Sequence, residues 1–179
     1  MKGDDPAEEN CGRLSDSGPG GDCMPVPVTG SREETVWVER DGWRMEGVLT
    51  LPEVSDADYR APVVVLVHGS GPQSRHGGLS GSLGVDFGTT VETYRSLADQ
   101  LAARGVATLR YDKRSCFNEA VPDCAARLDD YPGDVNAIVV DDFVQDARAA
   151  IRSLDGRPEL ADVIVAGHSQ GGSFVPHLV

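Results

Sequence analysis

The sequence predicts an α/β protein, in which an N-terminal β-hairpin is followed by parallel strands that alternate with helices. Two observations support this fold class. Short apolar runs rich in β-branched residues occur at 62–67, 106–111 and 163–166, and such runs are typical of strands covered on both faces of a parallel sheet. The segments between these runs contain amphipathic helical patterns. At 179 residues the chain has room for one hydrophobic core.

Residues 1–34 are predicted to form a disordered leader, and order is expected to begin near Thr35. The leader contains many Gly, Pro, Ser and acidic residues and few large apolar ones. It therefore cannot bury enough surface to offset the entropy lost on ordering. Strands are expected at 36–40 and 43–51, joined by Asp41-Gly42, a dipeptide that favours a tight hairpin turn. The folded domain is accordingly expected to span 35–179.

Two helices are expected between the parallel strands. The first is capped by Thr89 or Thr90 and ends at Gly105, and the second is capped by Asp141 or Asp142. Their apolar faces are Val91, Tyr94, Leu97, Ala98, Leu101 and Ala102 in the first helix, and Phe143, Val144, Ala147, Ile151 and Leu154 in the second.

The charge of the chain limits its partners. A formal net charge of -13 and a pI near 4.5 argue against binding to nucleic acid and to anionic membrane surfaces. No apolar run approaches the length of a membrane span. No cofactor is expected, and no metal site either, because the cysteine spacings differ from those of zinc sites.

Four cysteines fall into two pairs, Cys11 with Cys23 and Cys116 with Cys124. A disulfide in the second pair would close a short polar loop and stabilise it by about 2–3 kcal/mol. It would imply an oxidising compartment, whereas residues 1–5 lack the apolar core of a signal peptide. Localisation stays open: cytoplasmic with free thiols as written, or exported if the N-terminus is incomplete and the disulfide forms.

The segment Gly167-His168-Ser169-Gln170-Gly171 follows an apolar strand and matches the G-x-S-x-G pattern of a nucleophile elbow. A serine on this sharp strand-to-helix turn has a strained backbone, so the residues two before and two after it must be small. Both positions are glycine here. The turn also places Ser169 at a helix N-terminus, where free N–H groups favour a developing oxyanion. Ser169 is therefore the candidate nucleophile.

Two further strand-end motifs accompany this turn, 68–72 (HGSGP) and 110–114 (RYDKR). With them the chain resembles the α/β-hydrolase superfamily from about residue 35 onward. More narrowly, it is similar to bacterial esterases related to dienelactone hydrolases and serine aminopeptidase-type hydrolases. The resemblance implies a serine hydrolase that cleaves carboxylic esters of small molecules through an acyl-enzyme on Ser169. It also implies that the backbone N–H groups of Gln170 and Ser70 are the oxyanion donors.

The resemblance gives other residues near the site supporting roles. His168 is expected to point away from the Ser169 hydroxyl, and His76 to be solvated. Asp112 and Arg114 are expected to hold down the loop after their strand. The residues with a structural role at the site are His68, Gly69, Gly167 and Gly171.

The chain departs from this family after Ser169. The family order is Ser, then Asp or Glu, then His, whereas residues 170–179 contain no acid and only His177. The chain is interpreted as the N-terminal part of the fold, with the C-terminal strands and helices, and the acid and base of the triad, missing. The alternative is a non-catalytic fragment or decayed paralogue that needs a partner to cover its open sheet edge. The choice between esterase, thioesterase and peptidase stays open.

Overall fold

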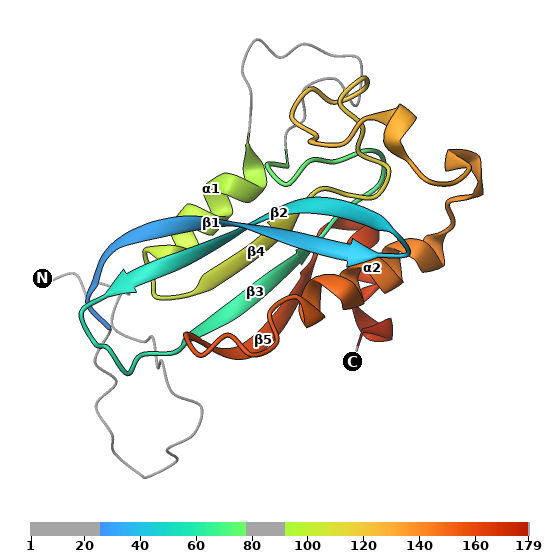
Figure 1. Cartoon of the computed structure of the whole chain (residues 1–179). Helices are drawn as coiled ribbons and strands as arrows, with labels where there is room; N and C mark the ends of the chain where they lie inside the picture. Colours follow the sequence, from blue (N-terminus) through green and yellow to red (C-terminus); the bar gives the residue numbers. More distant parts are fainter. Residues whose placement is uncertain (1–25, 78–91, 179) are drawn as a thin grey trace, which may run out of the picture.

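The computed structural model describes residues 26–77 and 92–178. They form a five-stranded mixed sheet of order β1-β2-β4-β3-β5 with two α-helices packed on it (Figure 1). The elements are β1 (Val28–Arg40), β2 (Trp43–Val54), β3 (Ala61–Val67), α1 (Thr93–Ala102), β4 (Ala107–Tyr111), η1 (Leu128–Asp130), η2 (Val135–Ala137), α2 (Val140–Arg152), β5 (Leu160–Gly167), η3 (Ser169–Ser173) and η4 (Val175–His177).

Strands β1 and β2 form the predicted hairpin. Asp41 and Gly42 connect them with φ angles of 53° and 74°, as a two-residue turn matched to the strand twist requires. β1 begins at Val28, seven residues before the expected start at Thr35. The early segment needs no large apolar side chains because its backbone pairs with the far end of β2, where Val28 lies opposite Val54. Residues 1–25 of the predicted leader lie outside the described part of the chain.

The parallel part of the sheet has β3 between β4 and β5. β2 joins it by antiparallel pairing with β4. Successive residues of β3 face opposite sides: Val64 and Leu66 pack with Tyr94 of α1, whereas Val67 packs with Val144 of α2. The two helices therefore cover opposite faces of the sheet, and the sheet is buried between them as predicted.

Helix α1 starts at Thr93, after Glu92 at the N-cap position. Thr89 and Thr90, the expected caps, lie outside the described residues. Gly105 follows the helix with a φ of 84°, so the predicted end is confirmed. Of its predicted apolar face, Tyr94, Ala98 and Ala102 are buried and Leu97 is 42% exposed.

Helix α2 starts at Val140, earlier than predicted, and neither Asp141 nor Asp142 is its N-cap. The Asp142 carboxylate instead reaches back to accept a hydrogen bond from the N–H of Val139, at 2.9 Å. An acid at the third helical position satisfies an N-terminal N–H as well as a capping residue does. Neither α1 nor α2 is long and apolar enough to cross a membrane.

Strand β5 lies at one edge of the described sheet and pairs only with β3 (Figure 1). Val163 and Ile164 on it are 41% and 48% exposed, so the predicted open hydrophobic edge is present among the described residues. The helix expected after β5 is replaced by the two 3₁₀ segments η3 and η4. Pro176 lacks the N–H that an α-helix would direct to the Gly172 carbonyl.

Candidate active site at the ends of β3, β4 and β5

Ser169 follows β5 directly and has a φ of 51°, a left-handed conformation that costs energy for any residue with a side chain. The turn is held from both sides. The His168 N–H donates to the Val67 carbonyl at 2.9 Å, and the Gly171 N–H donates to the His168 carbonyl at 2.8 Å. Ser169 itself is exposed. A strained serine fixed by its surroundings and open to solvent has the geometry of a nucleophile elbow.

The glycines around Ser169 differ in how much space they require. A Cβ on Gly171 would lie 2.3 Å from the Val67 carbonyl oxygen, and one on Gly167 would lie 2.5 Å from backbone atoms of Gly171. Both distances are shorter than any real Cβ contact. A Cβ on Gly172 would have its nearest neighbour at 3.7 Å, an ordinary contact. Steric need therefore explains the glycines at 167 and 171 but not the one at 172.

The loop after β3 lies against this turn. A Cβ on Gly69 would be 3.1 Å from the Cβ of Ser169. The Gly69 N–H donates to Gln73 Oε1 at 3.0 Å, and Gln73 Nε2 donates to the Ser70 carbonyl at 3.2 Å. Within the described chain, the N–H groups of Ser70 and Gln170 donate to no other residue. These are the two groups that the sequence predicts as oxyanion donors.

His68 lies deep beneath the loop after β3. Its Nε2 meets the Tyr111 carbonyl, and since a carbonyl only accepts, this nitrogen carries the proton. Burial, with a smaller effect from the nearby charge of Lys113, lowers the pKa of His68 to about 3, against the opposing hydrogen bond to Tyr111. The ring is therefore neutral and joins the ends of β3 and β4. This arrangement suits the supporting role predicted for His68.

The rings of His168 and His76 contact residues other than Ser169. His168 Nδ1 lies 2.9 Å from the Tyr94 hydroxyl, so its ring points toward α1 as predicted. The prediction that His76 is solvated is wrong: the residue is half-buried, and its Nδ1 lies 3.1 Å from Arg110 Nη1. No described histidine ring is hydrogen-bonded to the Ser169 hydroxyl.

A sequence model of the alpha/beta hydrolase family matches residues 64–178. The match covers more than half of the chain and all three strand-end motifs. The chain belongs to the alpha/beta hydrolase family. Esterase EstD from Thermotoga maritima is a curated relative of this α/β-hydrolase, 28% identical over 134 residues, which are 75% of this chain and 27% of EstD.

Solved esterase structures have the same fold. Esterase Est22 matches with a TM-score of 0.55 and 20% identity over 86% of this chain and 39% of its own. Est1E from Butyrivibrio proteoclasticus matches with a TM-score of 0.50 and 18% identity over 80% of this chain and 44% of its own. The predicted α/β-hydrolase fold is confirmed, and the chain spans less than half the length of each of these three relatives.

Gln73 and Tyr94 join the loop after β3 to the turn after β5. The Tyr94 hydroxyl donates to Gln73 Oε1 at 2.9 Å and also contacts His168 Nδ1. Because a hydroxyl has one proton, the Nδ1–H of His168 donates to Tyr94. Burial raises the pKa of Tyr94 to about 12, so this proton stays in place. The sequence predicted Tyr94 only as part of an apolar helix face, although a tyrosine hydroxyl that is buried usually finds a polar partner.

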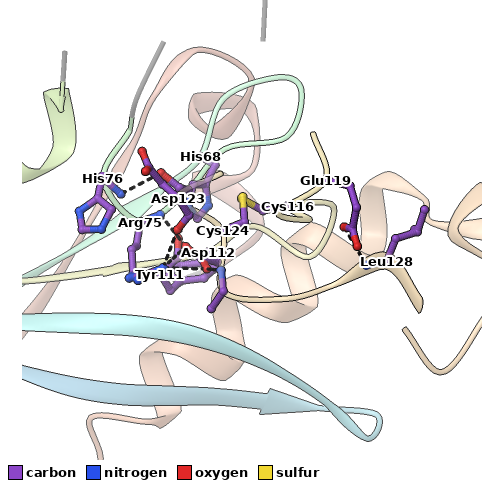
Figure 2. The surroundings of a disulfide bond; sticks show 12 residues. His68, Arg75, His76, Tyr111, Asp112, Cys116, Glu119, Asp123, Cys124 and Leu128 are labelled. Atoms are coloured by element: carbon purple, nitrogen blue, oxygen red, sulfur yellow. Dashed lines mark hydrogen bonds and ion pairs between the residues drawn. A yellow bond between two sulfur atoms is a disulfide. The ribbon is translucent and has the colours of Figure 1, made fainter. Parts of the chain in front are cut away.

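Asp112 connects the loops after β3 and β4 (Figure 2). Its carboxylate accepts hydrogen bonds from the Arg75 N–H at 2.8 Å, from Arg75 Nη1 at 3.0 Å and from the Ala125 N–H at 2.9 Å. Arg75 Nη1 also donates to the Asp123 carbonyl at 3.0 Å. The predicted role of Asp112 in holding its loop is confirmed, and its partner Arg75 was not identified from the sequence.

Arg114 fastens the same loop to helix α2. Its Nη2 and Nε lie 2.6 and 2.8 Å from the two carboxylate oxygens of Asp146, and both side chains are buried. Arg40 of β1 adds a third contact to Asp146, at 3.1 Å. No group of three or more His, Cys, Asp or Glu side chains in residues 26–77 and 92–178 could hold a metal ion.

Cys116 and Cys124 form a disulfide in the loop after β4 (Figure 2). Both are buried together with Val121. Asp123 and Ala125, which contact Arg75 and Asp112, flank Cys124 in the sequence. The disulfide therefore restrains the segment that holds the loop after β3. Cys11 and Cys23 lie outside the described residues.

Reducing this disulfide is expected to lower the free energy of unfolding by about 2–3 kcal/mol, because a short closed loop restricts the unfolded chain. The measurement is denaturant unfolding with and without reductant, in a Cys11→Ser/Cys23→Ser background that isolates the described pair. A midpoint that does not move with reductant, or a count of two free thiols in the unreduced double variant, would contradict the expectation.

Proposed function

We propose that this chain carries the nucleophile and the oxyanion donors of a serine esterase. Ser169 attacks the carbonyl carbon of a carboxylic ester, and the alcohol leaves as an acyl-enzyme forms. Water then releases the acid and restores the serine. The backbone N–H groups of Gln170 and Ser70 bind the oxygen that becomes negative in the tetrahedral intermediate.

The observation that carries this proposal is the strained backbone of Ser169, at a φ of 51°, on an exposed turn. Strain of this kind persists only where surrounding bonds impose it, and it is concentrated at functional sites. The adjacent contacts support the proposal further. The Gly69 loop lies against Ser169, and the N–H groups of Ser70 and Gln170 have no other partner among the described residues.

The acid and base of the reaction are assigned to residues outside this chain. A serine hydroxyl needs an adjacent base to become a nucleophile. His68, His76 and His168 are engaged with Tyr111, Arg110 and Tyr94 respectively. EstD, of which the chain spans 27%, is called an esterase, and this name is the basis for choosing an ester as the substrate class.

The proposal is tested on the full-length protein, meaning this chain together with the residues that supply the acid and base. It is reacted with a fluorophosphonate probe, and the adduct is located by tandem mass spectrometry. The adduct is expected on Ser169. Ser173, four positions along the same peptide, is the internal control because its hydroxyl donates to the Gln170 carbonyl at 2.6 Å. No adduct in folded protein, or an adduct on Ser173, would refute the proposal.

The exposed edge of β5 favours a second candidate, a non-catalytic chain whose open sheet edge is covered by a partner. Val163 and Ile164 expose apolar surface there, and an unpaired strand is a template for another strand. The same labelling experiment separates the two, because only a catalytic chain forms the Ser169 adduct.

A further inference from the structure

Lys113 is a buried cation without an acidic partner in the described chain. It is 5% exposed, and its ammonium donates to the Gly69 carbonyl at 2.7 Å and lies 4.3 Å from the ring centroid of Phe143. Asp146, which lines the same small cavity, is already paired with Arg114. Burying an unpaired charge costs several kcal/mol, so an apolar side chain would serve the fold better here.

The Lys113 ammonium lies where it can polarise the peptide group between Gly69 and Ser70. The Gly69 carbonyl and the Ser70 N–H belong to one peptide group. A cation on the carbonyl oxygen draws electron density away from the nitrogen and makes the N–H a stronger donor, because hydrogen bonds in a chain polarise one another. The N–H of Gly69 donates to Gln73, whereas the Ser70 N–H has no partner among the described residues and is the donor proposed above for the oxyanion.

We propose that Lys113 is a positioning residue for ester hydrolysis, which acts through the Gly69–Ser70 peptide to strengthen and orient the Ser70 N–H toward the oxyanion. This inference rests on the esterase function proposed above. It assigns a role to a charge that the fold does not need.

Of Lys113 and the groups that face it, Lys113 is the residue whose charge is expected to change near pH 8. His68 at the end of β3 is held neutral, with a pKa of about 3, and burial raises the pKa of Tyr111 on β4. Arg114, in the loop after β4, forms an ion pair with Asp146 on α2. Burial lowers the pKa of Lys113 from 10.5 to about 8.

Activity and stability should therefore respond to pH in opposite directions. The ammonium is the active form, so kcat is expected to fall as the pH rises through about 8. The folded protein gives up this proton before the unfolded chain does. The free energy of unfolding therefore rises as the pH increases from 8 to 10.5. The full gain is present above pH 10.5, and none of it is present below pH 8. A purely structural lysine would show only the change in stability.

The test compares Lys113→Met with Arg104→Met in the full-length protein. Arg104 is an exposed cation on the surface after α1, so its variant controls for loss of one positive charge. Lys113→Met is expected to lower kcat and kcat/KM together by roughly 10-fold, a fraction of the 10²–10³-fold lost with a whole oxyanion donor. It is also expected to remove the decline above pH 8.

A second measurement covers the case in which Lys113→Met does not fold. In the unaltered protein labelled with ¹⁵N-serine, the Ser70 amide resonance should shift with pH, with a midpoint near 8. A constant Ser70 resonance overturns the inference. So does a kcat within twofold of the parent in folded Lys113→Met with the alkaline decline retained. Absence of the Ser169 fluorophosphonate adduct overturns the esterase proposal itself, so the two failures are distinguishable.

Discussion

Replacing Ser169 with alanine is expected to reduce ester hydrolysis by the full-length protein by on the order of 10⁴- to 10⁶-fold. In the proposed mechanism this hydroxyl forms the covalent intermediate, and no neighbouring residue replaces it. The other serine of η3, Ser173, is turned to the Gln170 carbonyl. The measurement is kcat/KM for a p-nitrophenyl ester, together with the free energy of unfolding to establish that the variant is folded.

The Ser169→Ala variant should lose activity without losing stability. A left-handed backbone is strained for alanine as for serine, so the substitution leaves the cost of the turn unchanged. Ser96→Ala, on the exposed side of α1, is the matched control and should keep full activity. Residual turnover by Ser169→Ala within tenfold of the parent would mean that another group performs the chemistry.

Gly171→Ala is expected to lower kcat/KM by about 100-fold or more and to destabilise the fold by about 1–3 kcal/mol. The new Cβ would lie 2.3 Å from the Val67 carbonyl oxygen and 2.5 Å from that of His68. These are backbone atoms of the end of β3, and the Val67 carbonyl also accepts the His168 N–H. The turn must therefore shift, and it carries Ser169 and the Gln170 N–H with it.

Gly172→Ala is the control for this prediction, since its Cβ would meet nothing closer than 3.7 Å. Comparing Gly171→Ala with Gly172→Ala separates the steric requirement at position 171 from the general effect of adding a methyl group to a glycine-rich turn. Steady-state kinetics and denaturant unfolding of both variants provide the comparison. Equal losses in the two variants would show that close approach at Gly171 is not the cause.

The sequence predicted those parts of the fold that depend on local patterns. The Asp41-Gly42 turn, the buried run of β3 and the end of α1 at Gly105 follow from backbone preferences and from apolar periodicity. The early start of β1 was missed because its first residues are held by pairing with β2, which side-chain polarity does not reveal. The 3₁₀ turns after Ser169 were missed as well, because a helix was expected to follow the strand there.

At the candidate site, the sequence predicted roles for groups in the glycine-rich motifs and predicted none for the residues that contact these motifs from elsewhere in the chain. Ser169, Gln170 and Ser70 belong to glycine-rich motifs with fixed spacing. Tyr94 and Lys113 reach the loop after β3 through contacts between segments far apart in the chain. No spacing rule connects such residues, so only the folded arrangement of β3, β4 and α1 brings them together.

The strand order has a consequence for synthesis on the ribosome. β3 is made before β4, yet β4 lies between β3 and the β1–β2 hairpin. The hairpin and β3 therefore share no ladder until β4 has emerged, and the nascent chain carries two unjoined pieces of sheet until then. β5 docks on β3 only afterwards, and the bond from the His168 amide to the Val67 carbonyl forms with it. The turn at Ser169 therefore cannot adopt its described geometry until β5 has paired with β3.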